Sequence, residues 1–209
     1  MKDLIIIGGG GFGRETLDVV EAINNTESTW NFLGFIDDNE PEIEKLNRRG
    51  VKWLGGRENL QNYKNASFVV GISNPKIRRE LAHFAEESGL QAAILIHPHA
   101  YIGSEVQIGP GTIVCVGASM TTNIHIGEHS QINPRVLIGH DAKVKNFVSI
   151  YPGATIGGNV VISDDVTVGA NATILQGLTI GEQSFIGAGA VVTKVVPSHV
   201  IAKGVPASW

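Results

Sequence analysis

Residues 150–168 read IYPGATIGGNVVISDDVTV and carry an isoleucine or valine at every sixth position. The same register runs without an insertion from residue 102 to residue 192. The residues in this register are Ile102, Ile108, Val114, Met120, Ile126, Ile132, Ile138, Val144, Ile150, Ile156, Ile162, Val168, Ile174, Ile180, Ile186 and Val192. Helices repeat about every 3.6 residues and strands about every two, so neither explains a preference for one residue in six. The pattern therefore indicates an internal structural repeat.

Branched residues at one fixed place favour short β-segments, and a six-residue unit is long enough for a short strand and a corner. Three units make one triangular coil of eighteen residues, with the repeated Ile or Val pointing inward. Small or aliphatic residues recur four places later, among them Val106, Ala118, Ala142, Ala154, Val160, Ala172 and Ala190. Coils that pair in parallel stack about 4.8 Å apart, so the repeat predicts a prism on the order of 25 Å long.

The first hundred residues follow a different pattern. An apolar run at residues 4–7 ends in the turn GGGGFG at residues 8–13, and apolar residues at helical spacing follow. Gly8, Gly10 and Gly13 satisfy the pattern G-x-G-x-x-G. In such a turn, backbone N–H groups and the helix N-terminus hold phosphate, which makes Gly10, Gly11 and Phe12 candidate substrate-binding residues. The alternative is a tight turn that only packs a helix on a sheet.

A second strand at residues 32–36 ends in Asp37 and Asp38, about where a Rossmann unit places its ribose-binding carboxylate. A third strand at residues 67–70 leads into a turn that begins at Gly71, a helix at 75–87 and a last strand at 92–95. We therefore add Asp37, Asp38 and Gly71 to the candidate substrate-binding residues. We therefore expect a small Rossmann-like α/β unit over residues 1–95 and a β-helix over residues 96–209. A complete dinucleotide domain needs two βαβαβ halves, so this short unit fits a mononucleotide moiety better than NAD.

Composition excludes several classes of function. The 209 residues carry a formal charge of −4, which offers no footprint for nucleic acid. No apolar stretch is long enough to span a membrane, and the N-terminus runs straight into a β pattern, so we expect neither membrane insertion nor a signal peptide. The single cysteine, Cys115, excludes an intramolecular disulfide and fits a reducing cytoplasm. No Cys/His group has zinc-ligand spacing, so we expect no metal.

His140 is the best candidate for a general base. It occupies the third place of IGHDAK at residues 138–143, which is a coil corner. Its neighbours one coil away are Thr122 and Gly158, both small enough to leave room for a substrate. Asp141 follows directly, and a carboxylate beside an imidazole orients the ring and raises its basicity. The alternative is an ordinary exposed corner histidine.

The repeat Ile/Val-Gly-x-x-small-x resembles the hexapeptide repeat of left-handed β-helix acyltransferases, and the left-handed sense is implied by that resemblance. Together with the N-terminal unit, the whole chain resembles the bacterial sugar acetyltransferases. This group includes N-acetyltransferases acting on nucleotide-linked 4-amino sugars and sialic acid O-acetyltransferases. The resemblance rests on the GGGGFG turn, the Asp37-Asp38 pair, the turn at residues 71–74, the His140-Asp141 pair and GVPA at residues 204–207.

The resemblance implies an all-β left-handed parallel β-helix after the α/β unit, with His140 as base and Asp141 as its partner. It also implies acetyl-CoA as a diffusible donor, which relatives contact at positions matching Ala170 and Ala188. Ser149 stands where relatives usually carry a histidine that contacts CoA. Relatives are homotrimers in which the active site lies between neighbouring prisms. The implied reaction is direct transfer to a sugar amine, without an acyl-enzyme, in cytoplasmic glycan biosynthesis.

One catalytic role is our own hypothesis: backbone N–H groups near Gly158 stabilise the tetrahedral oxyanion. Three alternative functions remain open. The first is O-acetylation of a sialic acid, for which the chain has arginines at positions 14, 78, 79 and 135. The second is an NAD-dependent oxidoreductase built on the glycine-rich turn, although the short α/β unit and the long repeat disfavour it. The third is a β-helix scaffold without catalysis.

Overall fold

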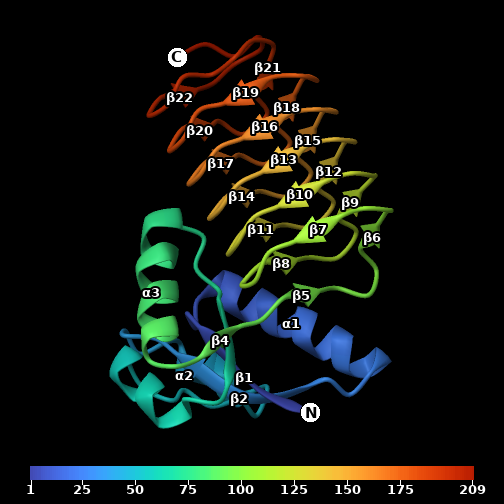
Figure 1. Cartoon of the computed structure of the whole chain (residues 1–209). Helices are drawn as coiled ribbons and strands as arrows, with labels where there is room; N and C mark the ends of the chain where they lie inside the picture. Colours follow the sequence, from blue (N-terminus) through green and yellow to red (C-terminus); the bar gives the residue numbers. More distant parts are fainter. The chain divides into compact units, whose positions relative to one another are not determined.

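The computed structural model describes all 209 residues, which form two compact units at residues 1–98 and 99–209. Figure 1 shows an α/β unit followed by a stack of short parallel strands. The expected order of an α/β unit and then a parallel β-helix is confirmed. The division lies three residues beyond the expected limit between residues 95 and 96.

The first unit is built on one parallel sheet with the strand order β2-β1-β3-β4. Its strands are β1 (Lys2–Ile7), β2 (Trp30–Ile36), β3 (Ser67–Val70) and β4 (Gln91–Ala92), and β5 (Leu95–Ile96) follows. Its helices are α1 (Gly11–Thr26), α2 (Ile43–Asn47), the 3-10 helix η1 (Arg57–Tyr63) and α3 (Pro75–Glu87). Because β1 lies between β2 and β3, the turns that follow these three strands meet at one edge of the sheet.

Two parts of this unit differ from the sequence-based expectation. The segment between β2 and β3, to which no element was assigned, contains α2 and η1. The expected strand at residues 92–95 is instead split into β4 and β5. Ala93 lies in the break, where its amide bonds to the Phe68 carbonyl at 2.8 Å and its side chain is buried. The period of the sequence did not reveal this break because the residues on both sides of it are apolar.

Close backbone contacts hold the glycine-rich turn on the sheet. Gly8 has a φ of 103°, which is in the left-handed region that glycine adopts without strain. A Cβ on Gly13 would overlap the carbonyl oxygen of Gly8, and one on Gly71 would lie 2.6 Å from the Gly13 Cα. The three glycines therefore pack backbone on backbone, and any side chain would separate helix α1 from the sheet.

The second unit is a β-helix with three parallel faces. The β6 sheet contains β6 (Tyr101–Ile102), β9 (Ser119–Met120), β12 (Leu137–Ile138), β15 (Thr155–Ile156), β18 (Thr173–Ile174) and β21 (Val191–Val192). The β7 sheet contains β7 (Gln107–Ile108), β10 (His125–Ile126), β13 (Lys143–Val144), β16 (Val161–Ile162) and β19 (Thr179–Ile180). The β8 sheet contains, within this unit, β8 (Ile113–Val114), β11 (Gln131–Ile132), β14 (Ser149–Ile150), β17 (Thr167–Val168), β20 (Phe185–Ile186) and β22 (Ile201–Ala202).

Strand partners lie eighteen residues apart, as the repeat predicts: Ile138 pairs with Met120 on one side and with Ile156 on the other. The repeated residues from Val114 to Val192 are buried, and so are Ala118, Ala142 and Ala154 at the second recurring position. Burial of each such Ile or Val side chain contributes roughly 1.5–3 kcal/mol. The repeat therefore supplies the core of this unit.

Each corner of the β-helix includes a residue in an unusual backbone conformation. Asn123, Asp141 and Asn159 have positive φ values of 54°, 60° and 56°. Asn and Asp tolerate this left-handed region better than other non-glycine residues do. Asp141 therefore also suits its position for a conformational reason, independent of chemistry.

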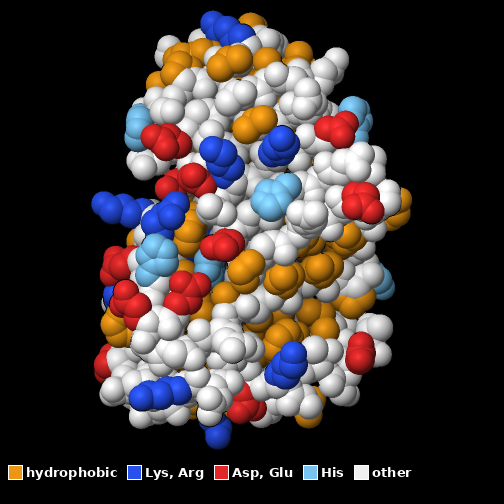
Figure 2. Space-filling model, in the orientation of Figure 1, with side chains coloured by type: hydrophobic (Ala, Val, Ile, Leu, Met, Phe, Trp, Pro, Cys, Tyr) orange, Lys and Arg blue, Asp and Glu red, His pale blue; other side chains and the backbone are white.

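The surface drawn in Figure 2 mixes basic and acidic side chains, with no continuous basic stripe on that face. No helix of the protein is both long and apolar enough to cross a bilayer. The mixed surface agrees with the formal charge of −4.

The glycine contacts generate a stability prediction. We expect Gly13→Ala to lower the free energy of unfolding of the first unit by about 1–3 kcal/mol, because the methyl group overpacks a filled site. Gly11→Ala is the matched control, since a Cβ there meets nothing within 4 Å, and alanine should add up to about 1 kcal/mol of helix propensity. Urea unfolding in a Trp209→Phe background, followed by the fluorescence of Trp30 and Trp53, measures both in the first unit. Equal effects of the two substitutions would contradict the backbone-on-backbone contact.

Candidate active site

The corner after β12 carries the candidate base. The chain leaves the β6 sheet at Ile138 and reaches the β7 sheet at Lys143, with Gly139, His140 and Asp141 between them. The Gly139 amide bonds to the Ile156 carbonyl at 2.8 Å, and the Asp141 amide bonds to the Thr122 carbonyl at 3.1 Å. The backbone on both sides of His140 is thus fixed by the coils above and below it.

The side chains of His140 and Asp141 form a pair. Nδ1 of His140 lies 2.7 Å from Oδ2 of Asp141, and the two side chains are 65% and 51% exposed. In a neutral imidazole, Nδ1–H donates to the carboxylate and Nε2 is left with its lone pair. This tautomer suits a general base whose reacting nitrogen faces a bound substrate.

Gly158 makes room for the imidazole. A Cβ on Gly158 would lie 2.7 Å from Nε2 and 2.8 Å from Cε1 of His140, so the ring lies directly over the glycine Cα. The Gly158 N–H donates to no acceptor within the chain. The expected neighbourhood of His140 and Gly158 is therefore present. Thr122, on the other side, uses its hydroxyl to contact Ser104 Oγ at 2.9 Å.

The candidate CoA-binding residues lie at a different edge of the prism. Ala170 follows β17 and Ala188 follows β20, both on the β8 sheet, whereas His140 follows β12 on the β6 sheet. Within one chain the structure therefore does not bring these alanines to the His140 corner. Ser149 lies on β14 of the β8 sheet and is buried.

The alanine edge is apolar along its length. The residues at this corner of successive coils are Val116, Pro134, Pro152, Ala170 and Ala188. Val116 is 43% exposed. The His140 edge is polar by contrast, with Ser104, Thr122, His140, Gly158, Gln176 and Lys194 in the equivalent places.

In the first unit, the glycine-rich turn leaves part of its backbone open. A Cβ on Gly10 or Gly11 would meet nothing within 4 Å, and α1 begins at Gly11. The first four N–H groups of a helix have no partner within the helix, so the amides around Gly10, Gly11 and Phe12 can receive an anion. Gly71 serves a different purpose, because it is buried against Gly13 and its amide bonds to the Ile7 carbonyl at 2.7 Å.

Both carboxylates after β2 already hold protein donors. Oδ2 of Asp37 accepts the Gly9 N–H at 2.8 Å and Oδ1 accepts the Asn39 N–H at 3.0 Å. Oδ1 of Asp38 accepts the Arg57 backbone N–H at 2.8 Å, and Oδ2 accepts Nε of Arg57 at 2.6 Å. Asp37 thus holds the glycine-rich turn in place, and Asp38 fixes the start of η1.

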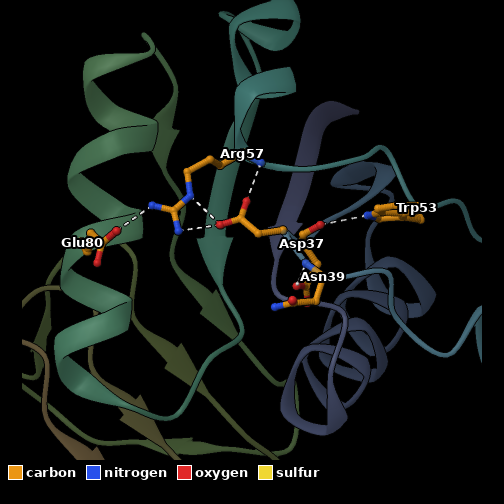
Figure 3. A network of polar contacts seen from close by, with 6 residues as sticks. Asp37, Asn39, Trp53, Arg57 and Glu80 are labelled. Atoms are coloured by element: carbon orange, nitrogen blue, oxygen red, sulfur yellow. Dashed lines mark hydrogen bonds and ion pairs between the residues drawn. The ribbon is translucent and has the colours of Figure 1, made fainter.

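Arg57 extends this network to α3, as Figure 3 shows. Its Nη1 donates to Oε1 of Glu80 at 2.6 Å, and its guanidinium lies 5.9 Å from the centroid of the Phe84 ring. The Nε1–H of Trp53 donates to the Asp37 carbonyl at 3.1 Å. The hydrogen bond from the Arg57 side chain lowers the pKa of Asp38, and the two acceptor carboxylates, Asp38 first, raise the pKa of Arg57.

A cavity of about 270 Å³ lies beside this network at the carboxyl ends of β1 and β2. Its lining residues are Ile7, Gly8, Ile36, Asp37, Asp38, Asn39, Arg57, Ile72, Ile77, Glu80 and Leu81. Asp37 and Asp38 are among the residues expected from the sequence, whereas Arg57 and Glu80 are not. Neither residue belongs to a motif, and only the fold brings the start of η1 to the side of α3.

His125 and His129 lie four residues apart in the sequence but in different surroundings in the structure. His125 is exposed on β10, whereas His129 is buried and stacks on Phe147 with ring centroids 5.1 Å apart. The two side chains therefore do not form a metal-binding pair. The structure contains no group of three or more His, Cys, Asp or Glu side chains placed to bind a metal ion.

Comparison with known proteins identifies relatives of both units. Residues 3–84 match the family model of the PglD N-terminal domain, and residues 159–194 match the model of the bacterial transferase hexapeptide (six repeats). The chain is 34% identical over 201 residues to a GDP-perosamine N-acetyltransferase of Escherichia coli O157:H7. The aligned region covers 95% of this chain and 81% of that protein. A UDP-N-acetylbacillosamine N-acetyltransferase of Bacillus subtilis is 30% identical over 122 residues, covering 54% of this chain and 51% of that protein.

Solved structures agree with these relatives. The crystal structure of PerB from Caulobacter crescentus, in complex with CoA and GDP-perosamine, has a TM-score of 0.90 and 26% sequence identity. The match covers 100% of this chain and 97% of that chain. Because the relative from Escherichia coli matches nearly the whole chain, and because both units match the corresponding family models, the chain belongs to the nucleotide-4-amino-sugar N-acetyltransferases that join a PglD N-terminal domain to a hexapeptide-repeat β-helix.

Proposed function

We propose that this protein transfers the acetyl group of acetyl-CoA to the amine of a nucleotide-linked 4-amino sugar. The observation that carries the proposal is the His140–Asp141 pair, 2.7 Å apart, with the imidazole over Gly158. The relatives support the substrate class, because their names describe N-acetyltransferases of nucleotide-linked sugars and one related structure holds CoA and GDP-perosamine.

In the proposed mechanism, His140 is the general base. Its Nε2 takes a proton from the sugar amine as the amine nitrogen attacks the thioester carbon. Asp141 holds the ring in the correct tautomer and stabilises the imidazolium that forms. The Gly158 N–H, which donates to no acceptor in the chain, stabilises the oxyanion of the tetrahedral intermediate. The C–S bond then breaks, and the imidazolium returns its proton to the CoA thiolate.

The nucleotide part of the substrate is assigned to the first unit. The open amides of Gly10, Gly11 and Phe12 receive the diphosphate at the N-terminus of α1. Asp37 and Asp38 stand beside the cavity that receives the rest of the nucleotide. Gly71 contributes by keeping the turn close to the sheet rather than by direct contact. An NAD-dependent oxidoreductase is disfavoured, since the sheet has four strands rather than two βαβαβ halves.

We propose that acetyl-CoA contacts Ala170 and Ala188, with Ser149 on the same face of the prism. Because these alanines and His140 occupy different edges of one prism, a complete site needs edges from two copies. We therefore propose a homotrimer in which the His140 edge of one subunit faces the alanine edge of its neighbour. The apolar column from Val116 to Ala188 supports this assembly. It carries no charged side chain, and the cores of protein–protein interfaces are likewise depleted of charged residues.

We place the reaction in the cytoplasm, where acetyl-CoA and nucleotide sugars are made, as a step in building a glycan. O-acetylation of a sialic acid is the second candidate. One arginine considered for it, Arg78, is buried and donates to the carbonyls of Ile72 and Ser73 at 2.9 and 3.0 Å. An acetyl-CoA assay against GDP-, UDP- and dTDP-linked 4-amino sugars and free sialic acids separates the two candidates.

His140→Ala tests the catalytic role. We expect kcat to fall by about 10²–10⁴-fold, since that is the usual contribution of a general base. Asp141→Asn should lower kcat while keeping the left-handed corner, because asparagine tolerates positive φ. His125→Ala, an exposed histidine on β10, is the control. Unchanged turnover by His140→Ala in a correctly assembled protein would contradict the role of His140 as general base, whereas no acetyl transfer by the wild-type protein to any sugar would favour the scaffold interpretation.

Gly158→Ala tests the position of the ring. The added Cβ would lie 2.7 Å from Nε2, so the imidazole must turn away and kcat should fall at least tenfold with little change in thermal stability. The double variant with His140→Ala should be no slower than His140→Ala alone, since the two changes act on one group. If the losses of kcat in the two single variants add up in the double variant, displacement of the imidazole is not the reason that Gly158→Ala is slow.

A mixing experiment tests the shared site. His140→Ala and Ala188→Trp subunits should each be inactive as homo-oligomers. If each site uses His140 of one subunit and Ala188 of another, random mixing restores about a quarter of all sites, which is about one site in three within the mixed trimers. Co-expression with two different affinity tags isolates the mixed oligomers for assay. No recovery in mixed oligomers would place both residues in one subunit's site.

A further inference from the structure

The cavity in the first unit has two chemically different parts. Its apolar wall consists of Ile7, Ile36, Ile72, Ile77 and Leu81. Its polar wall consists of Asp37, Asp38, Asn39, Arg57 and Glu80. At about 270 Å³ it lies just below the range of about 300–1,000 Å³ usual for small-molecule sites. This volume suits one flat ring system, packed on apolar side chains and read along one polar edge.

The polar wall is richer in acceptors than in donors. The wall contains three carboxylates and one guanidinium, and each ionised carboxylate has about four acceptor sites. Oε1 of Glu80 accepts Nη1 of Arg57 at 2.6 Å, whereas Oε2 of Glu80 accepts no hydrogen bond within the chain. Asp37 accepts the Gly9 and Asn39 N–H groups and keeps about two acceptor sites. Asp38 accepts one backbone N–H and two side-chain N–H groups of Arg57 and keeps about one. A ligand edge that fits this wall must therefore present donors.

Arg57 fixes the geometry of that wall. It contacts Asp38 through its backbone N–H and its side chain, and it contacts Glu80 on α3 through Nη1. Its guanidinium therefore joins the loop after β2 to a helix that is more than 40 positions away in the sequence. Without this bridge, Glu80, whose side chain is 64% exposed, would rotate freely in solvent.

We propose that Arg57 is a positioning residue that holds Asp38 and Glu80 as an acceptor wall, and that this wall makes the site select a guanine nucleotide. Guanine alone among the common bases presents two adjacent donors, N1–H and the N2 amino group, on its pairing edge. Uracil and thymine present two carbonyl acceptors around one N–H, and these would face the carboxylates. The inference rests on the proposed function and adds the choice of base.

The selection works by repulsion as well as by attraction. Carboxylates that accept two donors from guanine leave the carbonyl oxygens of uracil or thymine beside negative charge. A bidentate contact of this kind makes binding of the matching base about tenfold or more tighter than binding of another base. The spare N–H groups of Arg57 remain available for the guanine O6.

Binding of GDP, UDP, dTDP and CDP, measured by isothermal titration calorimetry on the full chain, tests the proposal. We expect the wild-type protein to bind GDP about tenfold or more tightly than the other three. Glu80→Gln keeps an oxygen for Arg57 but places an amide donor in the wall. It should weaken GDP binding by about tenfold and strengthen binding of UDP and dTDP. Glu87→Gln, an exposed acid two turns along α3, should change nothing.

Arg57→Lys and Arg57→Ala test the positioning role. Lysine keeps the charge but cannot bridge two carboxylates in a fixed geometry, so both variants should lose the preference for GDP. With a GDP-linked substrate, KM should rise for the sugar nucleotide but not for acetyl-CoA, and kcat at saturation should stay within about twofold, since the reacting groups are not touched. A general loss of folding would instead lower the apparent kcat and leave both KM values unchanged, because the molecules that remain folded keep their affinities.

The results separate this inference from the proposed function. Preference for UDP or dTDP in the wild-type protein, with acetyl transfer intact, would overturn the choice of guanine and leave the transferase standing. Preference for GDP that persists in Glu80→Gln and in both Arg57 variants would show that the base is selected elsewhere, and so would overturn the role of the wall. Tight GDP binding without acetyl transfer to any sugar would contradict the proposed function alone.

Discussion

Every other feature of the second unit depends on the parallel hydrogen-bond ladder between coils eighteen residues apart. Each coil donates its strand amides to the next, as in the bond from the Gly139 amide to the Ile156 carbonyl. The ladder holds only while every hexapeptide places its Ile or Val inward, because slipping by one residue would turn the apolar side chains toward water. The absence of insertions between residues 102 and 192 keeps the corners in straight columns, and this fixes which side chains can meet.

The catalytic candidates illustrate how a corner combines conformation with chemistry. Position 141 needs a residue that tolerates positive φ, as the asparagines at 123 and 159 also show. Aspartate meets that need and also places a carboxylate 2.7 Å from the His140 imidazole. The glycine at 158 then leaves the volume that the ring occupies. A rigid backbone thus orients the pair, so that little rotamer freedom remains to be lost when a substrate binds.

In the first unit, close glycine contacts and the hydrogen bonds of charged side chains fix the groups around the cavity. Glycines 8, 13 and 71 bring the turn, the helix and the sheet within contact distance of their backbones. Asp37 ties this turn to the end of β2, and Arg57 ties the end of β2 to α3. The bond from Gly9 to Asp37 is partly buried, whereas the bonds of Arg57 lie at the surface, where two N–H groups of its side chain hold the Asp38 carboxylate. The cavity beside them is consequently bounded by groups whose positions are set before any ligand arrives.

The sequence by itself determined the β-helix, its register, the glycine-rich turn and the His140–Asp141 pair, because each depends on spacing along the chain that the period of six converts directly into neighbours. It did not place α2 and η1, since that segment has no clear period, and it did not show the break between β4 and β5. Only the tertiary structure decided that Arg57 and Glu80 meet, whereas the eighteen-residue coil read from the sequence already places Ala170 and Ala188 on a different edge from His140. The physical reason is that such contacts join residues distant in sequence through folded backbone geometry, for which a local pattern of side chains carries no signal.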